Sequence, residues 1–132
     1  MAMDIRLTDA GRQHPMMAGR RDGYAVPCTH RDEVVRLPAG AVRLAGNEHS
    51  AVQAFAIDRD GVDFWGMQYH PEFSPGYVGH YLRGNGRASA DLADDLEAAQ
   101  TDADAAARLS TTPQDQAPPV RTTELANWLA RL

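Results

Sequence analysis

The sequence predicts one globular domain that combines strands with helices, the strands coming first. Segments of alternating or β-branched apolar residues occupy much of the chain before residue 70, a pattern typical of strands. After residue 75 the apolar residues recur at helical spacing. The length of 132 residues suits one ordinary domain rather than two.

Five segments carry the strand pattern: Ile5–Thr8, Tyr24–Thr29, Val34–Leu37, Ala51–Ile57 and Val62–Tyr69. The last two are the strongest, and the stretch between them ends in Asp60-Gly61. An Asp-Gly pair suits a hairpin turn, because such turns need residues with positive φ. We therefore expect these two segments to pair in antiparallel fashion.

Helical spacing begins after Pro75. A short helix is expected at Tyr77–Leu82, and Gly84-Asn85-Gly86 would end it. Ser89 would cap a longer helix, whose apolar stripe consists of Leu92, Leu96, Ala99, Ala103 and Ala106. The carboxylates on its other faces are interpreted as a solvated surface.

The end of the chain predicts a loop followed by a last helix. Thr111–Pro119 is rich in Pro and Gln, which is typical of a loop, and Thr122 or Thr123 would cap the helix after it. We expect both tryptophans, Trp65 and Trp128, to be core residues. The isolated His14 and His49 should face solvent.

Composition excludes several classes of protein. The formal net charge is -5, and the arginines form no cluster, so no nucleic-acid partner is expected. No apolar run approaches the roughly 18 residues of a membrane span, and the first residues have no signal-peptide pattern. The single cysteine, Cys28, cannot form an internal disulfide. We therefore expect a cytoplasmic protein that does not enter a membrane.

The stretch FWGMQYHPEFSP, residues 64–75, combines an apolar strand with a histidine and a glutamate at its end. Residues two apart in an extended strand point to the same face, so His70 and Glu72 could meet across Pro71. A carboxylate that orients an imidazole makes it a general base. The alternative is a strand-end histidine paired with a surface glutamate.

Metal binding is not expected at this strand end. His70, Glu72 and His80 lack the helical spacing of the usual zinc motifs, and no cysteine pair accompanies them. No cofactor is expected either.

The wider context resembles the second half of the class I glutamine amidotransferase domain, the type with a Cys-His-Glu triad. The motifs that carry this resemblance, in chain order, are His30-x-Asp32-x-Val34, Leu37-Pro38-x-Gly40-Ala41, Leu44-Ala45, Gln53-Ala54-Phe55 and Gln68-x-His70-Pro71-Glu72. The segments DIRLTDAGRQHPMMAGRRDGYAV and RTTELANWLARL are similar to later parts of that domain as well.

This resemblance implies a fold of the α/β class, flavodoxin-like and doubly wound, with a mixed sheet, an antiparallel hairpin and C-terminal helices. It also implies glutamine hydrolysis, in which a cysteine attacks the carboxamide and the ammonia passes to an acceptor. His70 would be the general base and Glu72 its orienting carboxylate. Thr29, His30 and Arg31 would contact bound glutamine.

Members of this family place their nucleophile in a Gly-x-Cys-x-Gly turn, and no such sequence occurs in these 132 residues. Cys28 has no flanking glycine and no helix pattern after it, so we interpret it as an inert, partly buried thiol. Residues 1–132 would then be the C-terminal half of the domain.

Two classes of function follow. In the first, the chain is part of a glutamine-hydrolysing enzyme, inactive alone and binding glutamine once the N-terminal half is supplied. In the second, it is a non-catalytic binding or regulatory module that folds by self-association. Either way, unpaired strand edges predict a homo-oligomer or a complex with the missing half.

Overall fold

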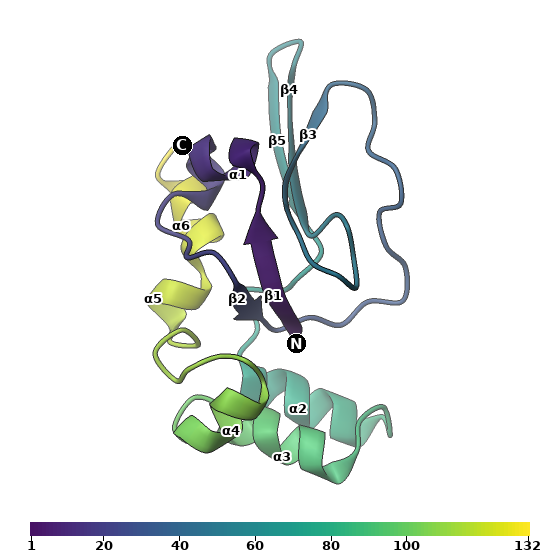
Figure 1. Cartoon of the computed structure of the whole chain (residues 1–132), viewed down its shortest axis with the longest axis vertical. Helices are drawn as coiled ribbons and strands as arrows, with labels where there is room; N and C mark the ends of the chain where they lie inside the picture. The colour runs from purple at the N-terminus through teal and green to yellow at the C-terminus, as the bar shows by residue number, and fades with distance from the viewer.

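A computed structural model describes all 132 residues and shows one five-stranded sheet with helices (Figure 1). The strands are β1 (Ala2–Leu7), β2 (Tyr24–Val26), β3 (Ala41–Gly46), β4 (Ala54–Arg59) and β5 (Val62–Met67). They lie in the order β2-β1-β3-β4-β5. The combination of sheet and helices agrees with the predicted α/β class.

The sheet is antiparallel throughout rather than mixed, which corrects one expectation. All four strand pairs run antiparallel. Parallel pairing needs a crossover connection of a dozen or more residues, usually a helix. Here the long helices follow the strands along the chain instead of alternating with them.

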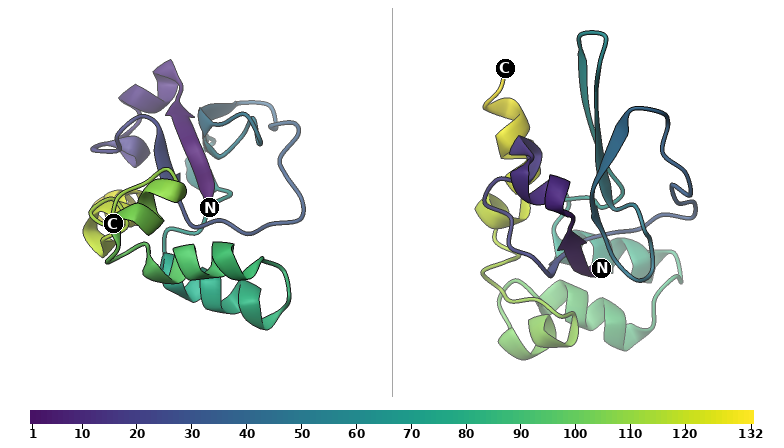
Figure 2. Two further views of the ribbon diagram at one scale, coloured as in Figure 1. Left: turned by 60° about the horizontal axis from the view of Figure 1, so that its bottom comes forward. Right: turned by 45° about the horizontal axis from the view of Figure 1, so that its top comes forward.

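The predicted hairpin is present as β4 and β5. Arg59 pairs with Val62, and the two residues between them, Asp60 and Gly61, have φ of 55° and 78°. Positive φ at both turn positions is the requirement of a type I′ turn. The hairpin projects beyond the rest of the sheet (Figure 2).

The predicted strand at Val34–Leu37 is absent, and residues 27–40 form an irregular connection between β2 and β3. Val35 is largely exposed there. No neighbouring strand supplies backbone partners to this segment, so its apolar residues alone do not make it a strand.

The remaining elements are helical: α1 (Asp9–Gln13), the 3-10 helix η1 (Pro15–Met17), α2 (Pro75–Gly84), α3 (Ala90–Ala98), α4 (Ala103–Arg108), α5 (Pro118–Arg121) and α6 (Thr123–Leu129). Ser74 caps α2 by accepting a hydrogen bond from the backbone N–H of Tyr77. The helix expected at Tyr77–Leu82 is present, begins two residues earlier than predicted, and ends at Gly84, the first residue of the predicted Gly84-Asn85-Gly86 stop.

The long helix expected after Ser89 is two helices, α3 and α4. Ser89 does cap α3, through the N–H of Leu92 at 3.3 Å. Asp102 accepts hydrogen bonds from the N–H groups of Asp104 and Ala105 and so starts α4 anew. Aspartate favours such N-cap positions over helix interiors, which explains the break.

The end of the chain also differs from the expected loop and cap. The short helix α5, Pro118–Arg121, begins inside the predicted loop Thr111–Pro119 and extends two residues past it, and Thr122 makes no side-chain cap for α6. Instead, the Thr122 hydroxyl donates to the carbonyl of Pro118.

The core lies against the sheet and is built from strand residues together with η1. Ile5, Val26, Leu44, Met16 and Tyr69 are almost fully buried in it. A second cluster joins α2, α3 and α4 at one end of the molecule.

The two tryptophans differ. Trp65 packs partly against the core, whereas Trp128 is 46% exposed, so its predicted core position is wrong. The last residues, 128–132, are all exposed, although Arg131 reaches β5 and pairs with Asp63 at 2.8 Å. His49 is exposed as expected, while His14 is half-buried edge-on against Trp65.

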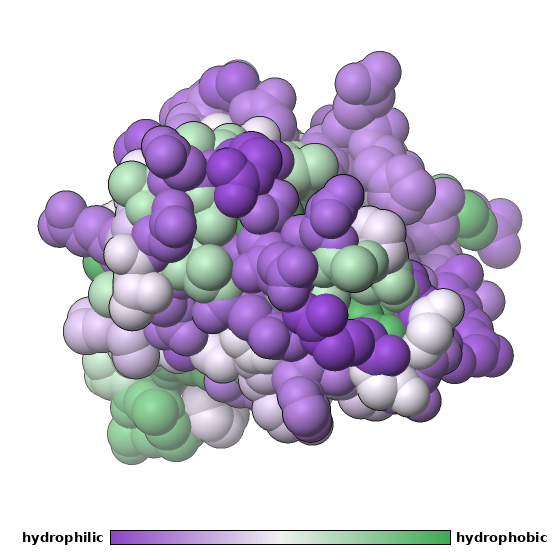
Figure 3. All heavy atoms as spheres, turned by 90° about the horizontal axis from the view of Figure 1, so that it is seen from below, coloured by the Kyte–Doolittle hydropathy of each residue, from purple (hydrophilic) through white to green (hydrophobic).

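The helical end of the molecule is mostly hydrophilic at its surface, with scattered apolar patches (Figure 3). Most carboxylates of α3 and α4 are exposed there, which confirms the predicted solvated face. None of the helices combines the length and hydropathy required to cross a lipid bilayer.

Candidate functional site

His70 lies just past the end of β5, where the chain bends at residues 68–69 and then turns at Pro71 and Glu72. The N–H of Phe73 donates to the carbonyl of His70 at 3.2 Å, so the extended backbone predicted across Pro71 is replaced by a turn. The N–H of Gln68 donates to the carbonyl of Gln53 at 2.9 Å, and that of His70 donates to the carbonyl of Pro27 at 2.8 Å. These bonds hold the backbone of His70 between the ends of β4 and β2.

His70 and Glu72 meet across the buried Pro71. The Nδ1 atom of His70 lies 2.7 Å from Oε1 of Glu72, and the side chains are 37% and 46% exposed. The ring of Phe73 stacks on the imidazole with centroids 5.2 Å apart. A carboxylate accepts the hydrogen bond, so Nδ1 carries the proton and Nε2 is left free to accept one from a reacting group.

Thr29, His30 and Arg31 lie in the connection after β2. Nδ1 of His30 lies 2.9 Å from the carbonyl oxygen of Asp32, and the Gln68 side chain donates to that oxygen at 3.1 Å. The predicted glutamine-contacting loop is therefore tied to the strand that leads to His70. Neither His70 nor Glu72 lines any of the five main surface pockets, so the two predicted groups of site residues do not share one of these cavities.

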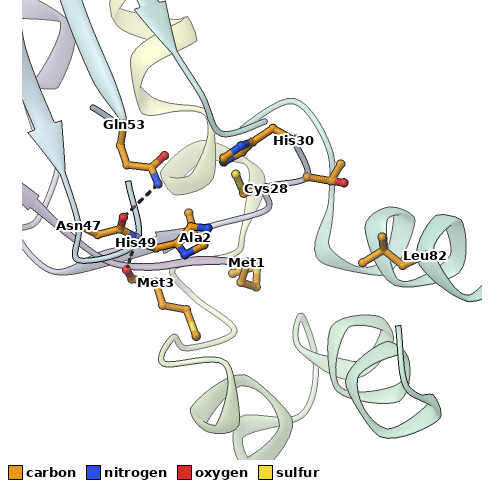
Figure 4. A pocket seen from close by; sticks show the side chains of 10 residues that line it. Met1, Ala2, Met3, Cys28, His30, Asn47, His49, Gln53 and Leu82 are labelled. Atoms are coloured by element: carbon orange, nitrogen blue, oxygen red, sulfur yellow. Dashed lines mark hydrogen bonds between the residues drawn. The ribbon is translucent and has the colours of Figure 1, made fainter. Parts of the chain in front are cut away.

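A pocket of about 440 Å³ lies beside this loop (Figure 4). Cys28, Thr29, His30 and Gln53 are among its lining residues. Cys28 and His30 lie close together on one side of it, and Gln53 is held by a hydrogen bond to Asn47.

The Cys28 thiol is half-buried and points at the backbone of the site strand, with Sγ 3.7 Å from the carbonyl oxygen of Gln68. Burial raises its pKa above the ordinary value of 9.0. A reactive cysteine needs the opposite shift, which a helix N-terminus or a neighbouring cation usually supplies. Residues 27–40 contain no helix that could do so.

No group of three or more His, Cys, Asp or Glu side chains in the chain gathers closely enough to hold a metal ion. His80, considered above as a possible ligand, is exposed on α2.

Sequence reasoning missed two residues that contact the site strand from the end of the chain. The Arg121 guanidinium donates to the carbonyls of Pro71 and Phe73, and Glu124 accepts a hydrogen bond from the hydroxyl of Tyr69. No motif signals these contacts. Both residues lie in the segment RTTELANWLARL, for which the sequence predicts only a last helix and a likeness to a later part of the family's domain.

Residues 2–86 match the family model described as "Glutamine amidotransferase class-I". A γ-glutamyl-L-1-hydroxyisopropylamide hydrolase of Pseudomonas sp is 42% identical over 87 residues, 66% of this chain and 29% of that protein. A glutamine-hydrolysing GMP synthase subunit of Methanoculleus marisnigri is 39% identical over 70 residues, 53% of this chain and 37% of that protein. The chain thus spans only a minor part of the length of the relatives it matches.

Proposed function

Because the chain belongs to the class I glutamine amidotransferase family, whose fold is flavodoxin-like, we propose that it supplies the general base of a glutamine-hydrolysing site. The contact that carries the proposal is the 2.7 Å pair of His70 and Glu72. Residues 1–132 correspond in this proposal to the C-terminal half of the domain, and the thiol nucleophile comes from a segment outside them.

The proposed reaction proceeds through an acyl-enzyme. Nε2 of His70 takes the proton of the nucleophilic thiol, and the thiolate attacks the γ-carboxamide carbon of glutamine. The imidazolium returns this proton to the amide nitrogen of the tetrahedral intermediate, whose C–N bond then breaks to release ammonia and leave a thioester. Water, deprotonated by His70, then releases glutamate and the thiol. Glu72 holds the imidazole in the Nδ1–H tautomer throughout.

Glutamine is the proposed substrate, contacted by Thr29, His30 and Arg31. The names of the two relatives point to the same kind of bond, because glutamine and a γ-glutamyl amide are both amides of the γ-carboxyl group of glutamate. We propose no nucleic-acid partner, which agrees with the net charge of -5. A lone cysteine agrees with the cytoplasm as the proposed compartment.

The proposal predicts that the chain alone is inactive and that it becomes active with the missing half. Cys28 is the only cysteine, and its raised pKa disfavours the thiolate. Ammonia release from glutamine is measured for the chain alone and again after a second protein is added. This second protein is an N-terminal fragment of the Methanoculleus relative, cut so that it stops before the region that matches this chain. Turnover is expected only in the mixture, and His70→Ala should lower it by about 10³-fold or more.

His80→Ala is the matched control, because His80 is an exposed histidine on α2, and it should leave turnover in the mixture unchanged. Turnover by the chain alone that depends on His70 would show that the nucleophile lies within these residues. A folded, associated mixture that releases no ammonia, or that remains active as His70→Ala, would refute the catalytic role.

A second candidate is a non-catalytic binding or regulatory module that folds by self-association. The observation that favours it is the edge strand β5, which leaves Val62 and Phe64 58% and 48% exposed. An exposed apolar strand edge is a surface that another chain tends to cover.

A further inference from the structure

One buried guanidinium holds the backbone on both sides of Glu72. Nη1 of Arg121 donates to the carbonyl of Phe73 at 2.8 Å and also to the carbonyl of Pro71. Its Nε lies 3.3 Å from the carbonyl of Gln116. Arg121 is only 6% exposed, so these carbonyls replace the water that its charge would otherwise bind.

Arg121 forms no ion pair with a carboxylate, which is unusual for a buried arginine. Burial lowers its pKa, and the charge of Glu72 acts in the opposite direction. The guanidinium therefore fixes the Pro71–Phe73 backbone and also places a positive charge near the carboxylate that His70 contacts.

The residue before His70 is anchored to the same segment of the chain. Oε1 of Glu124 accepts a hydrogen bond from the Tyr69 hydroxyl at 2.8 Å, and that hydroxyl also accepts one from Tyr24 at 2.9 Å. Tyr69 and Glu124 are almost fully buried. Burial, followed by the charge of Glu124, raises the pKa of Tyr69 well above its ordinary value, so its hydroxyl stays protonated and able to donate.

Arg20 links this anchor to the first part of the chain. It forms a buried, two-point ion pair with Glu124 and donates to the carbonyls of Val120 and Arg121 at 2.9 Å each. Burial is the largest single influence and opposes the charge of Arg20, but the hydrogen bond to Glu124 and the charge of its carboxylate, with smaller contributions from Tyr69 and Tyr24, together raise its pKa. In Figure 1, α5 and α6 accordingly lie beside η1 and β2, on the side of the sheet away from the β4–β5 hairpin.

We propose that Arg121 and Glu124, held by Arg20, form a clamp that positions the His70–Glu72 pair for proton transfer. The clamp holds residues 69, 71 and 73, which lie immediately before, between and after His70 and Glu72 in the sequence. Arg121 and Glu124 lie beyond residues 2–86, the part that matches the family model, whereas Arg20 lies within it. Its catalytic meaning rests on the function proposed above, whereas its structural effect on the imidazole does not.

The clamp acts through geometry and touches no reacting atom, so its members are positioning residues. With the carbonyls at 71 and 73 fixed, the Glu72 carboxylate stays within hydrogen-bond distance of Nδ1, and the neutral imidazole keeps its proton there. Without the clamp, the turn at Pro71 can shift, and the imidazole divides between its two tautomers. A displacement of about 1 Å at such a site can cost about 10²-fold in rate.

The test measures the His70 tautomer in the full chain by nitrogen-15 NMR of the imidazole at a pH where neutral histidine predominates. The unaltered chain should show His70 with its proton on Nδ1. Arg121→Met should mix the tautomers, and Arg121→Lys should restore part of the preference because it keeps a cationic donor. Arg108→Met removes an exposed arginine of α4 and should change nothing.

Tyr69→Phe, which removes only one hydroxyl, tests the other side of the clamp if Arg121→Met does not fold. It should also increase tautomer mixing, with circular dichroism unchanged. A folded variant, either Arg121→Met or Tyr69→Phe, that keeps His70 fully in the Nδ1–H form would overturn the clamp.

A second readout separates the clamp from the proposed function. In the mixture with the N-terminal half, Arg121→Met should lower kcat by about 10²-fold and leave KM for glutamine nearly unchanged. If the unaltered mixture releases no ammonia, the proposed function fails, while the NMR result still decides the clamp. If the mixture is active and kcat is unaffected by Arg121→Met, the clamp fails and the proposed function stands.

Discussion

Cys28 and His70 are backbone neighbours, because His70 donates to the carbonyl of the residue before Cys28, yet only His70 has a partner suited to proton transfer. Glu72 lies 2.7 Å from its Nδ1, whereas the Cys28 thiol lies against the carbonyl of Gln68. A thiol held against an acceptor and away from water keeps its proton. At the residue scale, the structure pairs the His70 imidazole with a carboxylate and gives the Cys28 thiol no such partner.

Cys28 should react slowly with a thiol reagent at neutral pH. Burial raises the pKa of Cys28 above 9.0, so the folded protein favours the protonated thiol. The contribution of this thiol to folding stability is therefore present below pH 9 and is lost as the pH rises through the pKa of Cys28 in the folded protein. Labelling with a disulfide reagent should be slower than that of a free cysteine at pH 7 and should rise steeply only above pH 9. Denaturant should remove the difference. Fast labelling of the native protein at pH 7 would contradict the assignment of an inert thiol.

The helical end depends on a close approach between α2 and α3. A Cβ added at Gly79 would lie 2.9 Å from the carbonyl oxygen of Ala93 and from the Cβ of Leu96. Val78 and Leu96 are buried beside this contact. At the element scale, glycine is required here because it lets two helix backbones come together, and the helix it belongs to follows directly from the His70–Glu72 turn.

Gly79→Ala should destabilise the chain by about 1–3 kcal/mol, because the added methyl group must push the two helices apart. Gly84→Ala is the matched control, since it lies in the same helix with nothing within 4 Å of the added Cβ. It should be neutral or stabilising by up to about 1 kcal/mol, because alanine favours the helix. Denaturant unfolding of both variants measures the difference, and equal stabilities would refute the close-packing explanation.

At the scale of the whole molecule, the β4–β5 hairpin projects from the body and ends the sheet at an unpaired edge (Figure 2). The rings of Phe55 and Phe64 lie 5.7 Å apart on this hairpin, and Phe64 is half exposed. Phe64 therefore lies on a strand edge that no other strand of the sheet covers.

The isolated chain is expected to self-associate at micromolar concentration through this edge. Phe64→Lys should shift it toward the monomer, because a charged residue on an edge strand opposes edge-to-edge pairing. Leu92→Lys adds the same charge at an exposed position of α3 and should leave the association unchanged. Light scattering gives the mass. A compact monomer of the unaltered chain would count against both the exposed-edge explanation and the self-associating module.

Local sequence signals predicted the features that depend on neighbouring residues. The Asp60-Gly61 turn and the short helix before Gly84 are of this kind, since a backbone angle or a helical period needs only a few residues. Val34–Leu37 failed as a strand because a strand also needs a partner. The long helix divided because Asp102 could cap a new one.

By itself, the sequence determined the family, the hairpin and the His-Pro-Glu spacing that lets an imidazole and a carboxylate meet. Only the tertiary structure decided that Trp128 is exposed and that Arg121 and Glu124 hold the turn around His70. The physical reason is sequence distance: the Arg121 contact with Pro71 joins residues 50 apart. Such a contact has no periodicity or turn signature, because it exists only once the chain has folded back on itself.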